Sequence, residues 1–452
     1  MRRTEMNRKL LSILATTVLM LTTSCNVTVP SSEEAPRSVS DPSSTEGSGP
    51  VQDIPDSYSL IDEGYVVPVV NQSQGTCWAN TGAEVMRYDL MVTSGVDLDI
   101  NVNDFVQVAL GGDPDEGIEG MYSNNRPQAG GSHQLIIAAA NNVDIDGYIM
   151  TEANDYSAAP REVIQEKIMT CGALTLVITG DQHYIDSIRA NATLNIPDQE
   201  LATTTHMVAI VGWDNNFSAD EFDPVASCNG AWLIQDSQGT AFGDNGYYWL
   251  SYDTPLFGVC DFQLSDGYTE VISYENGVKA TANTEGGTTV ASVYDHEGTI
   301  GAIGTYTSGP DQTITVEIYD GEFGELLYSE EQTFEYTGYH TVELDEPLDV
   351  ATYTVVIRYP EGAPVEGDSY EVDMSFMGGA LSGSYIGYYG SIEEGQSFIL
   401  IGDEWIDIST EGIEDLIEIR CDTLSTMPSW DEEEIHIPVI PNNPCIKVLY
   451  VA

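Results

Sequence analysis

Basic residues are scarce in this sequence of 452 residues. Lys and Arg number 14 against 73 Asp and Glu, which gives a formal net charge of −59 at pH 7. Nucleic acids and anionic lipid surfaces attract proteins through cations, so both are excluded as electrostatic partners. Disorder throughout is also excluded, because 42% of the residues are hydrophobic and 25 Tyr and 6 Trp are available for a core. A chain of this length predicts two or three domains.

The sequence also lacks an apolar run long enough to cross a bilayer near its start. Residues 10–21 form a run of 12 residues that follows four basic residues, a pattern typical of a secretory signal peptide. Residues 22–25, Thr-Thr-Ser-Cys, resemble a bacterial lipoprotein box. We therefore expect removal of residues 1–24 and a lipid on Cys25, with ordinary cleavage and secretion as the alternative. Both place the protein outside the cytoplasm, and the lipid would be its contact with the membrane.

The remaining chain changes in texture along its length. Residues 25–52 are rich in Ser, Pro and Glu and predict a flexible stalk. Residues 53–265 mix helical and strand-like periodicity. Residues 266–424 hold short β-rich runs between Gly, Pro and Asp turns, which favours an antiparallel sandwich and an α+β protein overall. Residues 425–452 are left unassigned. The clearest β-rich runs are residues 313–319, 340–344 and 352–359.

No CxxC or HExxH zinc spacing and no 12-residue calcium loop occurs, and we expect neither a metal at the catalytic site nor another cofactor, with calcium binding elsewhere left open. The cysteines predict at least one unpaired thiol. If Cys25 carries lipid and Cys77 stays a free thiol, five remain, and an odd number cannot all form disulfides within the chain. These five are Cys171, Cys228, Cys260, Cys421 and Cys445.

A lone Cys in a helical pattern is most often a small buried hydrophobe. The residues around Cys77 favour another interpretation, because Gly75 and Thr76 predict a turn and residues 78–90 predict a helix. Cys77 would then stand at a helix N-terminus. The free N–H groups and the helix dipole there lower the pKa of a thiol and favour a nucleophilic thiolate, which still needs an imidazole partner.

Among the six histidines, only His206 opens an apolar run, residues 205–214, which predicts a buried strand behind the imidazole. Residues 230–252 read as strand, Gly-rich turn and strand, and Asp236 ends the first of these strands. Nucleophile, base and orienting residue then follow in the order Cys, His, Asp. The other histidines are interpreted as surface or capping residues: His133, His183, His296, His340 and His436.

Three motifs in this order, at residues 71–78, 205–214 and 230–252, resemble the papain-like cysteine peptidases. The resemblance implies a two-lobed peptidase domain over residues 53–265. It further implies Cys77 as nucleophile, His206 as base and Asp236 as the residue that orients the base. Gln72 would donate to the oxyanion together with the Cys77 N–H, and Gly130 and Gly131 would bind the substrate backbone. Residues 266–424, with their best stretch at 397–407, resemble the lectin-like sandwich that follows the peptidase in some bacterial members.

Two departures from that family stand out. Gln72 lies five residues before Cys77 where the family has six, and Gln74 replaces a second cysteine. In place of the family's Asn-Ser-Trp-Gly turn, residues 236–239 read Asp-Ser-Gln-Gly, so the orienting residue is anionic and the shielding Trp is missing. We expect the charge of Asp236 to raise the pKa of His206 and to favour a thiolate–imidazolium pair.

Two functions stay open at this point. The first is a surface-anchored or secreted cysteine endopeptidase that cleaves polypeptides and contacts a glycan or surface protein through its sandwich. The second is a catalytically weak or inactive scaffold that acts as a binding lipoprotein. The reactivity of Cys77 distinguishes them. The short interval between Cys25 and residue 53 leads us to expect no folded propeptide, and the excess of acids predicts a fold that salt stabilises.

Overall fold

The structure is a computed structural model. The predicted signal peptide, Cys25 and the stalk lie outside the residues that it describes. In the described part of the chain, no helix is both long enough and apolar enough to cross a membrane. The described residues are 54–72, 74–143, 145–180, 182–199, 205–275, 279–284, 286–367, 369–373, 382–420 and 441–452.

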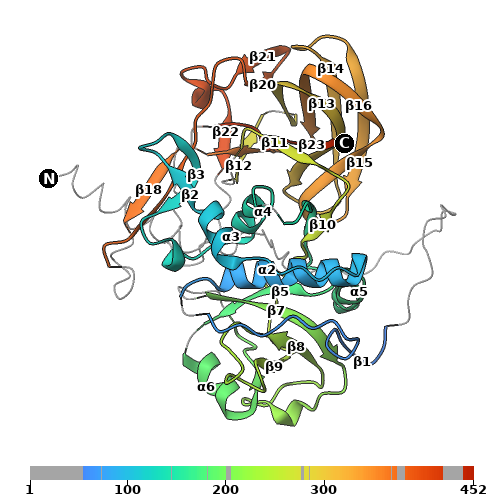
Figure 1. The fold of residues 1–452 in the computed structure, drawn as a ribbon, viewed down its shortest axis with the longest axis vertical. Helices are drawn as coiled ribbons and strands as arrows, with labels where there is room; N and C mark the ends of the chain where they lie inside the picture. Colours follow the sequence, from blue (N-terminus) through green and yellow to red (C-terminus); the bar gives the residue numbers. More distant parts are fainter. Residues whose placement is uncertain are drawn as a thin grey trace, which may run out of the picture.

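The N-terminal domain has a helical half and a sheet half, and the long helix α2 (Cys77–Asp89) runs between them (Figure 1). Because α2 is covered from both sides, Trp78, Val85 and Tyr88 are fully buried. Side chains cap two of the shorter helices: Asn101 accepts from backbone N–H groups at the start of one, and Ser132 does so at the start of another. The other helices of this part are η1 (Leu90–Ser94), α3 (Val102–Ala109), η2 (Arg126–Gln128), α4 (His133–Ala140) and α5 (Arg161–Cys171).

The sheet half is built around the strand β7 (Thr205–Asp214), whose residues between the two ends are buried. The strands follow the order β1-β7-β8-β9-β6, and β5 also pairs with β7. Since β7 and β8 are antiparallel, the start of β7 and the end of β8 lie at the same end of the sheet. The bounds are β1 (Ser57–Ser59), β5 (Leu174–Thr179), α6 (Gln182–Asn191), β6 (Thr193–Leu194), η3 (Ala219–Glu221), β8 (Ala231–Gln235) and β9 (Tyr247–Ser251).

The C-terminal domain consists of antiparallel sheets around an aliphatic and aromatic core, which confirms the predicted α+β class with a β-sandwich. The predicted runs at 340–344 and 352–359 belong to one long strand, β16, which stays paired with β13 across two register shifts. The bounds are β11 (Glu270–Ser273), β12 (Lys279–Asn283), β13 (Thr288–Thr307), β14 (Gln312–Asp320), β15 (Leu326–Phe334), β16 (Thr337–Tyr359), β17 (Ala363–Glu366), β20 (Ser397–Ile401), β21 (Glu404–Asp407), η6 (Ile413–Asp415), β22 (Glu418–Arg420) and β23 (Lys447–Val451).

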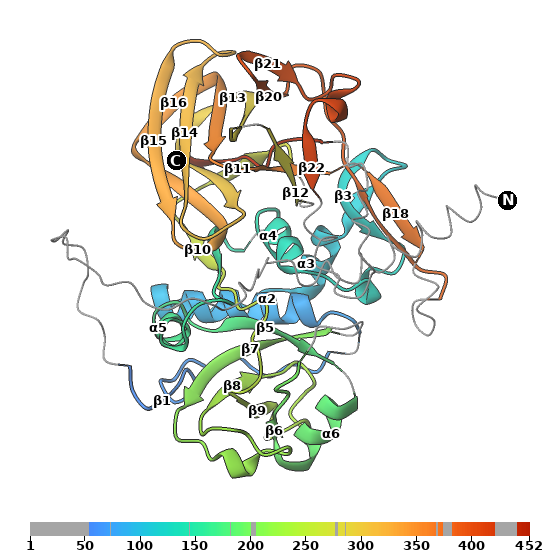
Figure 2. The same cartoon turned by 180° about the vertical axis from the view of Figure 1, so that it is seen from behind.

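The two domains share sheets rather than meeting at one flat boundary (Figures 1 and 2). β4 (Ile149–Asp155) of the N-terminal domain pairs with β16 and with β10 (Gln263–Ser265). In the other direction, two strands of the C-terminal half extend an N-terminal hairpin into a four-stranded sheet. β23, from the segment that the sequence left unassigned, pairs with β11 and β13. The shared sheet has β2 (Gly111–Asp113), β3 (Ile118–Ser123), β18 (Tyr370–Asp373) and β19 (Tyr385–Tyr389).

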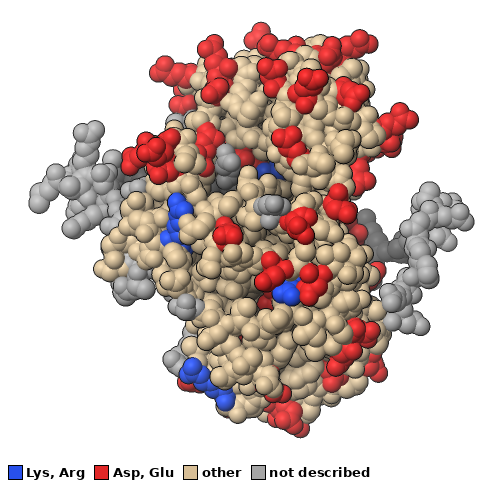
Figure 3. Space-filling model, in the orientation of Figure 1, with Lys and Arg blue, Asp and Glu red and all other residues tan. Residues whose placement is uncertain are grey.

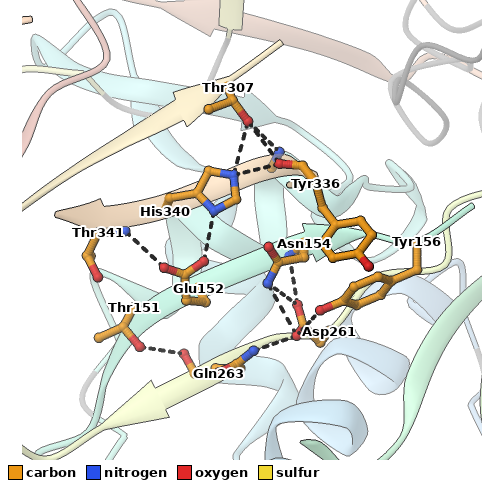
Figure 4. Close-up of polar contacts among 11 residues, drawn as sticks. Thr151, Glu152, Asn154, Tyr156, Asp261, Gln263, Thr307, Tyr336, His340 and Thr341 are labelled. Carbon is orange, nitrogen blue, oxygen red and sulfur yellow. Dashed lines mark hydrogen bonds and ion pairs between the residues drawn. The ribbon is translucent and has the colours of Figure 1, made fainter. Parts of the chain in front are cut away.

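Polar side chains fill the junction between β4 and β16 (Figure 4). His340 Nδ1 lies 2.8 Å from Glu152 Oε2, and His340 Nε2 lies 3.0 Å from Thr307 Oγ1 and 3.1 Å from the Tyr336 carbonyl oxygen. His340 is 1% exposed. The interpretation of His340 as a surface or capping residue was therefore wrong, because strand pairing across the domains covers its side chain.

His133 is likewise buried, although it is the first residue of α4. Its Nε2 lies 2.9 Å from Thr175 Oγ1, and burial lowers the pKa of His133 to about 4. The surface interpretation was wrong here as well, because the helix begins against the β5 side of the core. His296 is partly exposed beside Glu270. His436 lies outside the described residues.

Candidate active site

The predicted nucleophile Cys77 is the first residue of α2, directly after Thr76. Its side chain faces His206, which lowers the pKa of the Cys77 thiol. One helical turn further on, the buried Thr81 hydroxyl donates to the Met207 carbonyl oxygen at 2.9 Å. The helix that carries the thiol is thus fixed to the strand that carries the imidazole.

The predicted base and its partner meet where β7 begins and β8 ends. His206 is the second residue of β7, and Asp236 directly follows β8. His206 Nε2 lies 3.0 Å from Asp236 Oδ1, and the side chains are 8% and 0% exposed. A carboxylate only accepts, so Nε2 carries the hydrogen and Nδ1 is the nitrogen left to face Cys77. The structure therefore brings Cys77, His206 and Asp236 together in a chain.

The electrostatics of this chain favour a thiolate and an imidazolium. Burial opposes the charged form of His206, but the charge of Asp236 and its hydrogen bond outweigh burial and raise the pKa of His206 to about 10. Burial also opposes the thiolate, yet the hydrogen bond and charge of His206 lower the pKa of Cys77. Between these two pKa values the thiolate is both formed and paired, which is the state that attacks a carbonyl carbon.

The segment before the nucleophile pairs with the segment after Asp236. The Gln72 N–H donates to the Ser237 carbonyl oxygen at 2.8 Å, and the Ser237 hydroxyl donates to Gln72 Oε1. Gln72 Nε2 donates one hydrogen to the Gln74 carbonyl oxygen at 2.9 Å, and its second hydrogen has no acceptor among the described residues. Despite the shortened spacing, the side chain of Gln72 is therefore held next to the catalytic segment with a free donor.

The predicted substrate-binding glycines lie against the helix start. Gly131 packs on Trp78, the residue after the nucleophile, and a Cβ on Gly131 would overlap the indole ring. Gly130 has φ +74°, in the left-handed region that favours glycine, with open space where a Cβ would be. A Cβ on Gly75, two residues before Cys77, would stand 3.4 Å from Gln128 of η2. The segment 126–131 thus lies beside Gly75 and Trp78, on either side of Cys77.

Sequence reasoning missed two residues at this site. The Tyr184 hydroxyl, on α6, donates to Asp236 Oδ2, and the Tyr184 ring centroid lies 5.6 Å from that of His206. Glu84, two turns after Cys77 on α2, is 7% exposed, and burial raises the pKa of Glu84 well above its usual range. The Gln at position 238 indicated a missing aromatic cover, but no pattern in the sequence points to α6 as the element that supplies one.

The described residues contain no group of three or more His, Cys, Asp or Glu side chains placed to hold a metal ion. Cys171 is a buried free thiol and Cys228 an exposed one. Cys421, another of the five remaining cysteines, lies outside the described residues. The predicted lipidation residue Cys25 lies outside the described part of the chain.

Comparisons with known proteins agree with this geometry. Residues 54–266 match the papain family of cysteine proteases, and residues 266–417 match the lectin-like domain. Cathepsin 7 of Mus musculus is 23% identical over 205 residues, which are 43% of this chain and 60% of cathepsin 7.

Two solved structures share the two-domain fold. The cysteine protease and lectin-like domains of Cwp84, a surface layer associated protein of Clostridium difficile, give a TM-score of 0.65 at 18% identity, over 88% of this chain and 89% of that chain. Clostridial Cwp84 after propeptide cleavage gives 0.64 at 18% identity, over 88% and 99%. The chain thus contains a domain of the papain family of cysteine proteases at residues 54–266, which is followed by a lectin-like domain at residues 266–417.

Proposed function

We propose that this protein is a cysteine endopeptidase that works outside the cytoplasm. The observation that carries the proposal is the chain of Cys77, His206 and Asp236, in which the pKa of the thiol is lowered and that of the imidazole is raised. Such a pair has no structural need, since a Cys can pack as a neutral thiol. A pair of opposite charges at the N-terminus of a helix, beside the segment that contains Gly130 and Gly131, fits nucleophilic attack on a peptide.

The proposed reaction is acyl transfer to Cys77. Its thiolate attacks the peptide carbonyl carbon, and the oxyanion that forms accepts from the Cys77 N–H and from the free hydrogen of Gln72 Nε2. His206 then donates its proton to the leaving amine as the C–N bond breaks, which leaves a thioester. His206 next removes a proton from water, which attacks the thioester and releases the carboxylate product and the thiolate. Asp236 holds Nε2 throughout.

The thiol itself tests this function without knowledge of the substrate. We would treat the full-length protein with iodoacetamide and follow each cysteine peptide by mass spectrometry across pH. The exposed thiol of Cys228 serves as an internal reference. Faster labelling of Cys77 than of Cys228 at neutral pH, lost in His206→Ala, supports the peptidase. Labelling of Cys77 no faster than Cys228 would instead favour a scaffold without activity. Peptidase activity itself is measured as cleavage of dye-labelled casein, which we expect from the wild-type protein and not from Cys77→Ser.

We also propose that lipid on Cys25 anchors the protein and that the lectin-like domain contacts a glycan or a surface protein. The lipoprotein box at residues 22–25 supports the anchor. Full-length protein should follow the membrane fraction, and Cys25→Ser should move it to the soluble fraction. An array of glycans probed with the full-length Cys77→Ser protein tests the second part, and a lack of binding to every glycan would leave a protein partner as the ligand class.

A further inference from the structure

The two oxygens of the Asp236 carboxylate have different partners. Oδ1 accepts from His206 Nε2 at 3.0 Å, and Oδ2 accepts from the Tyr184 hydroxyl. In the described part of the chain, no second side chain donates to Oδ2. The phenol therefore extends the chain of thiol, imidazole and carboxylate by a fourth group, which comes from α6 rather than from the motifs around the other three.

Burial makes the contact between Tyr184 and Asp236 strong. Tyr184 is 3% exposed and Asp236 1% exposed. A hydrogen bond from a hydroxyl to a carboxylate is short and strong away from water, and an unpaired oxygen of a buried carboxylate is costly. A free carboxylate can rotate about its Cβ–Cγ bond, which would turn Oδ1 away from the imidazole. The phenol opposes that rotation because it pairs with the second oxygen.

The Tyr184 ring is fixed in place by aromatic neighbours. Its centroid lies 5.6 Å from the ring of His206, 5.7 Å from Phe242 and 6.3 Å from Tyr248. These contacts set the direction of the hydroxyl, and the ring also keeps water from the bond between His206 and Asp236.

We propose that Tyr184 is a positioning residue for the peptidase reaction: its hydroxyl holds the Asp236 carboxylate in the orientation that aligns His206 with Cys77. The inference rests on the proposed peptidase function. Tyr184 acts through Asp236, so we expect its loss to change the alignment and charge of the base and to leave substrate binding intact.

Two other titratable groups face this chain of four, and neither replaces the phenol. Glu84 lies on α2, and Tyr248 lies on β9. Glu84 Oε1 and the Tyr248 hydroxyl are buried without a hydrogen-bond partner in the described residues. Burial, and after it the charge of Asp236, raises the pKa of both groups, which favours their neutral forms. Tyr184 is thus the side chain that donates to the second oxygen of Asp236.

The test is Tyr184→Phe in the full-length protein, with Tyr248→Phe as the matched control. Tyr184→Phe keeps the ring and removes only the hydroxyl, so we expect kcat on dye-labelled casein to fall by about tenfold or more with KM within about twofold. Without its second donor, Asp236 is a stronger acceptor for His206. The basic limb of the pH–rate profile should therefore move to higher pH. Tyr248→Phe, which removes an unpaired hydroxyl, should change neither.

A purely structural role for Tyr184 would lower kcat without moving the basic limb, and that result overturns the proposal, as does an unchanged kcat. The double variant Tyr184→Phe, Asp236→Asn is a second measurement. The effect of the phenol should shrink in the Asn background because the carboxylate acceptor is gone, and equal effects in both backgrounds contradict the proposal.

The His206 titration separates this proposal from the peptidase function itself. It can be followed by NMR of the imidazole protons whether or not the protein hydrolyses peptides. Suppose that Cys77 of the wild-type protein labels no faster than Cys228, but that the pKa of His206 is higher in Tyr184→Phe than in the wild type. The hydroxyl of Tyr184 would then act on His206 through Asp236, while the proposed peptidase function would be wrong. A wild-type protein that cleaves casein, with a His206 titration identical in Tyr184→Phe, would overturn the positioning role alone.

Discussion

The hydroxyl of Thr81 donates to the carbonyl oxygen of Met207 at 2.9 Å, which joins the helix of the nucleophile to the strand of the base. Thr81→Val keeps the shape of the side chain and removes this buried bond. We expect a loss of about 1 kcal/mol in the free energy of unfolding, measured in urea, and slower labelling of Cys77. Thr93→Val is the control, because the Thr93 hydroxyl bonds within its own helical segment to the Asp89 carbonyl oxygen. Equal labelling rates in the two variants would refute the coupling.

The charge of Asp236 should set the alkaline limit of activity. The pKa of His206 is raised to about 10, so the imidazolium is kept up to that pH and is lost above it. In Asp236→Asn the amide oxygen still accepts from Nε2 but the charge is gone, so the basic limb of kcat/KM should move to lower pH. An unchanged basic limb would contradict the electrostatic role of Asp236.

The same shift predicts how stability depends on pH. A His whose folded pKa lies above its unfolded value of about 6.5 stabilises the fold fully below pH 6.5, and this contribution disappears as the pH rises through about 10. Wild-type protein should therefore lose more stability than Asp236→Asn between pH 7 and pH 10. Urea titrations at the two pH values measure the difference.

Local chemistry explains which parts of this site were predictable from sequence. Cys77, His206 and Asp236 each stand at or near the end of a helix or strand with a strong periodic pattern. These positions and the order of the three residues along the chain were enough to predict the site. Tyr184 lies on α6, whose turns hold no distinctive spacing, and its contact with Asp236 arises only from the packing of α6 on the sheet. A contact between distant segments leaves no local pattern.

The fold was predictable to a similar degree. The alternating runs predicted the antiparallel sandwich, since the alternation of apolar and polar residues within a strand indicates which of its faces is buried. The pairing of strands from one domain with strands from the other could not be predicted from the sequence. Strands pair through backbone N–H and C=O groups, which are the same in nearly every residue and therefore do not identify the partner strand. The burial of His340 follows from one such partnership, between β16 and β4, and so was missed with it.

Gly131 should tolerate no side chain. A Cβ there would overlap the indole of Trp78, which follows the nucleophile, so Gly131→Ala must displace either the loop or the helix start. We expect at least a tenfold loss of casein cleavage and a destabilisation of about 1–3 kcal/mol. Gly75→Ala is the matched change on the other side of Cys77, where a Cβ would stand 3.4 Å from Gln128 in ordinary contact. If Gly131→Ala behaves like Gly75→Ala, the segment around Gly131 can move away from Trp78 to accept a side chain, and the prediction is wrong.

The pair of the buried His340 and the partly buried Glu152 should stabilise the junction between the domains (Figure 4). Glu152→Gln removes the charge from beside a buried imidazole, and we expect a loss of about 1–3 kcal/mol with the two domains unfolding at more separate temperatures in calorimetry. Glu270→Gln disrupts the comparable but exposed pair with His296, which lies at 3.2 Å, and should shift the unfolding temperature little. Similar losses in the two variants would rule out a special role for the pair at the junction.

Acidic side chains spread over the visible surface, with few basic ones between them (Figure 3), and the whole chain carries a net charge of −59. Mutual repulsion of these carboxylates destabilises the compact state, and salt screens it. The melting temperature should rise by about 2–4 °C or more between low salt and 0.3 M NaCl, which corresponds to about 1 kcal/mol for a domain of this size. KCl should act alike, since screening depends on ionic strength.

The double variant Glu330→Gln, Glu331→Gln, at two exposed positions of β15, should start from a higher melting temperature in low salt and gain less from NaCl. A melting temperature that stays flat in salt for both proteins would mean that the surface charges are too far apart to oppose folding.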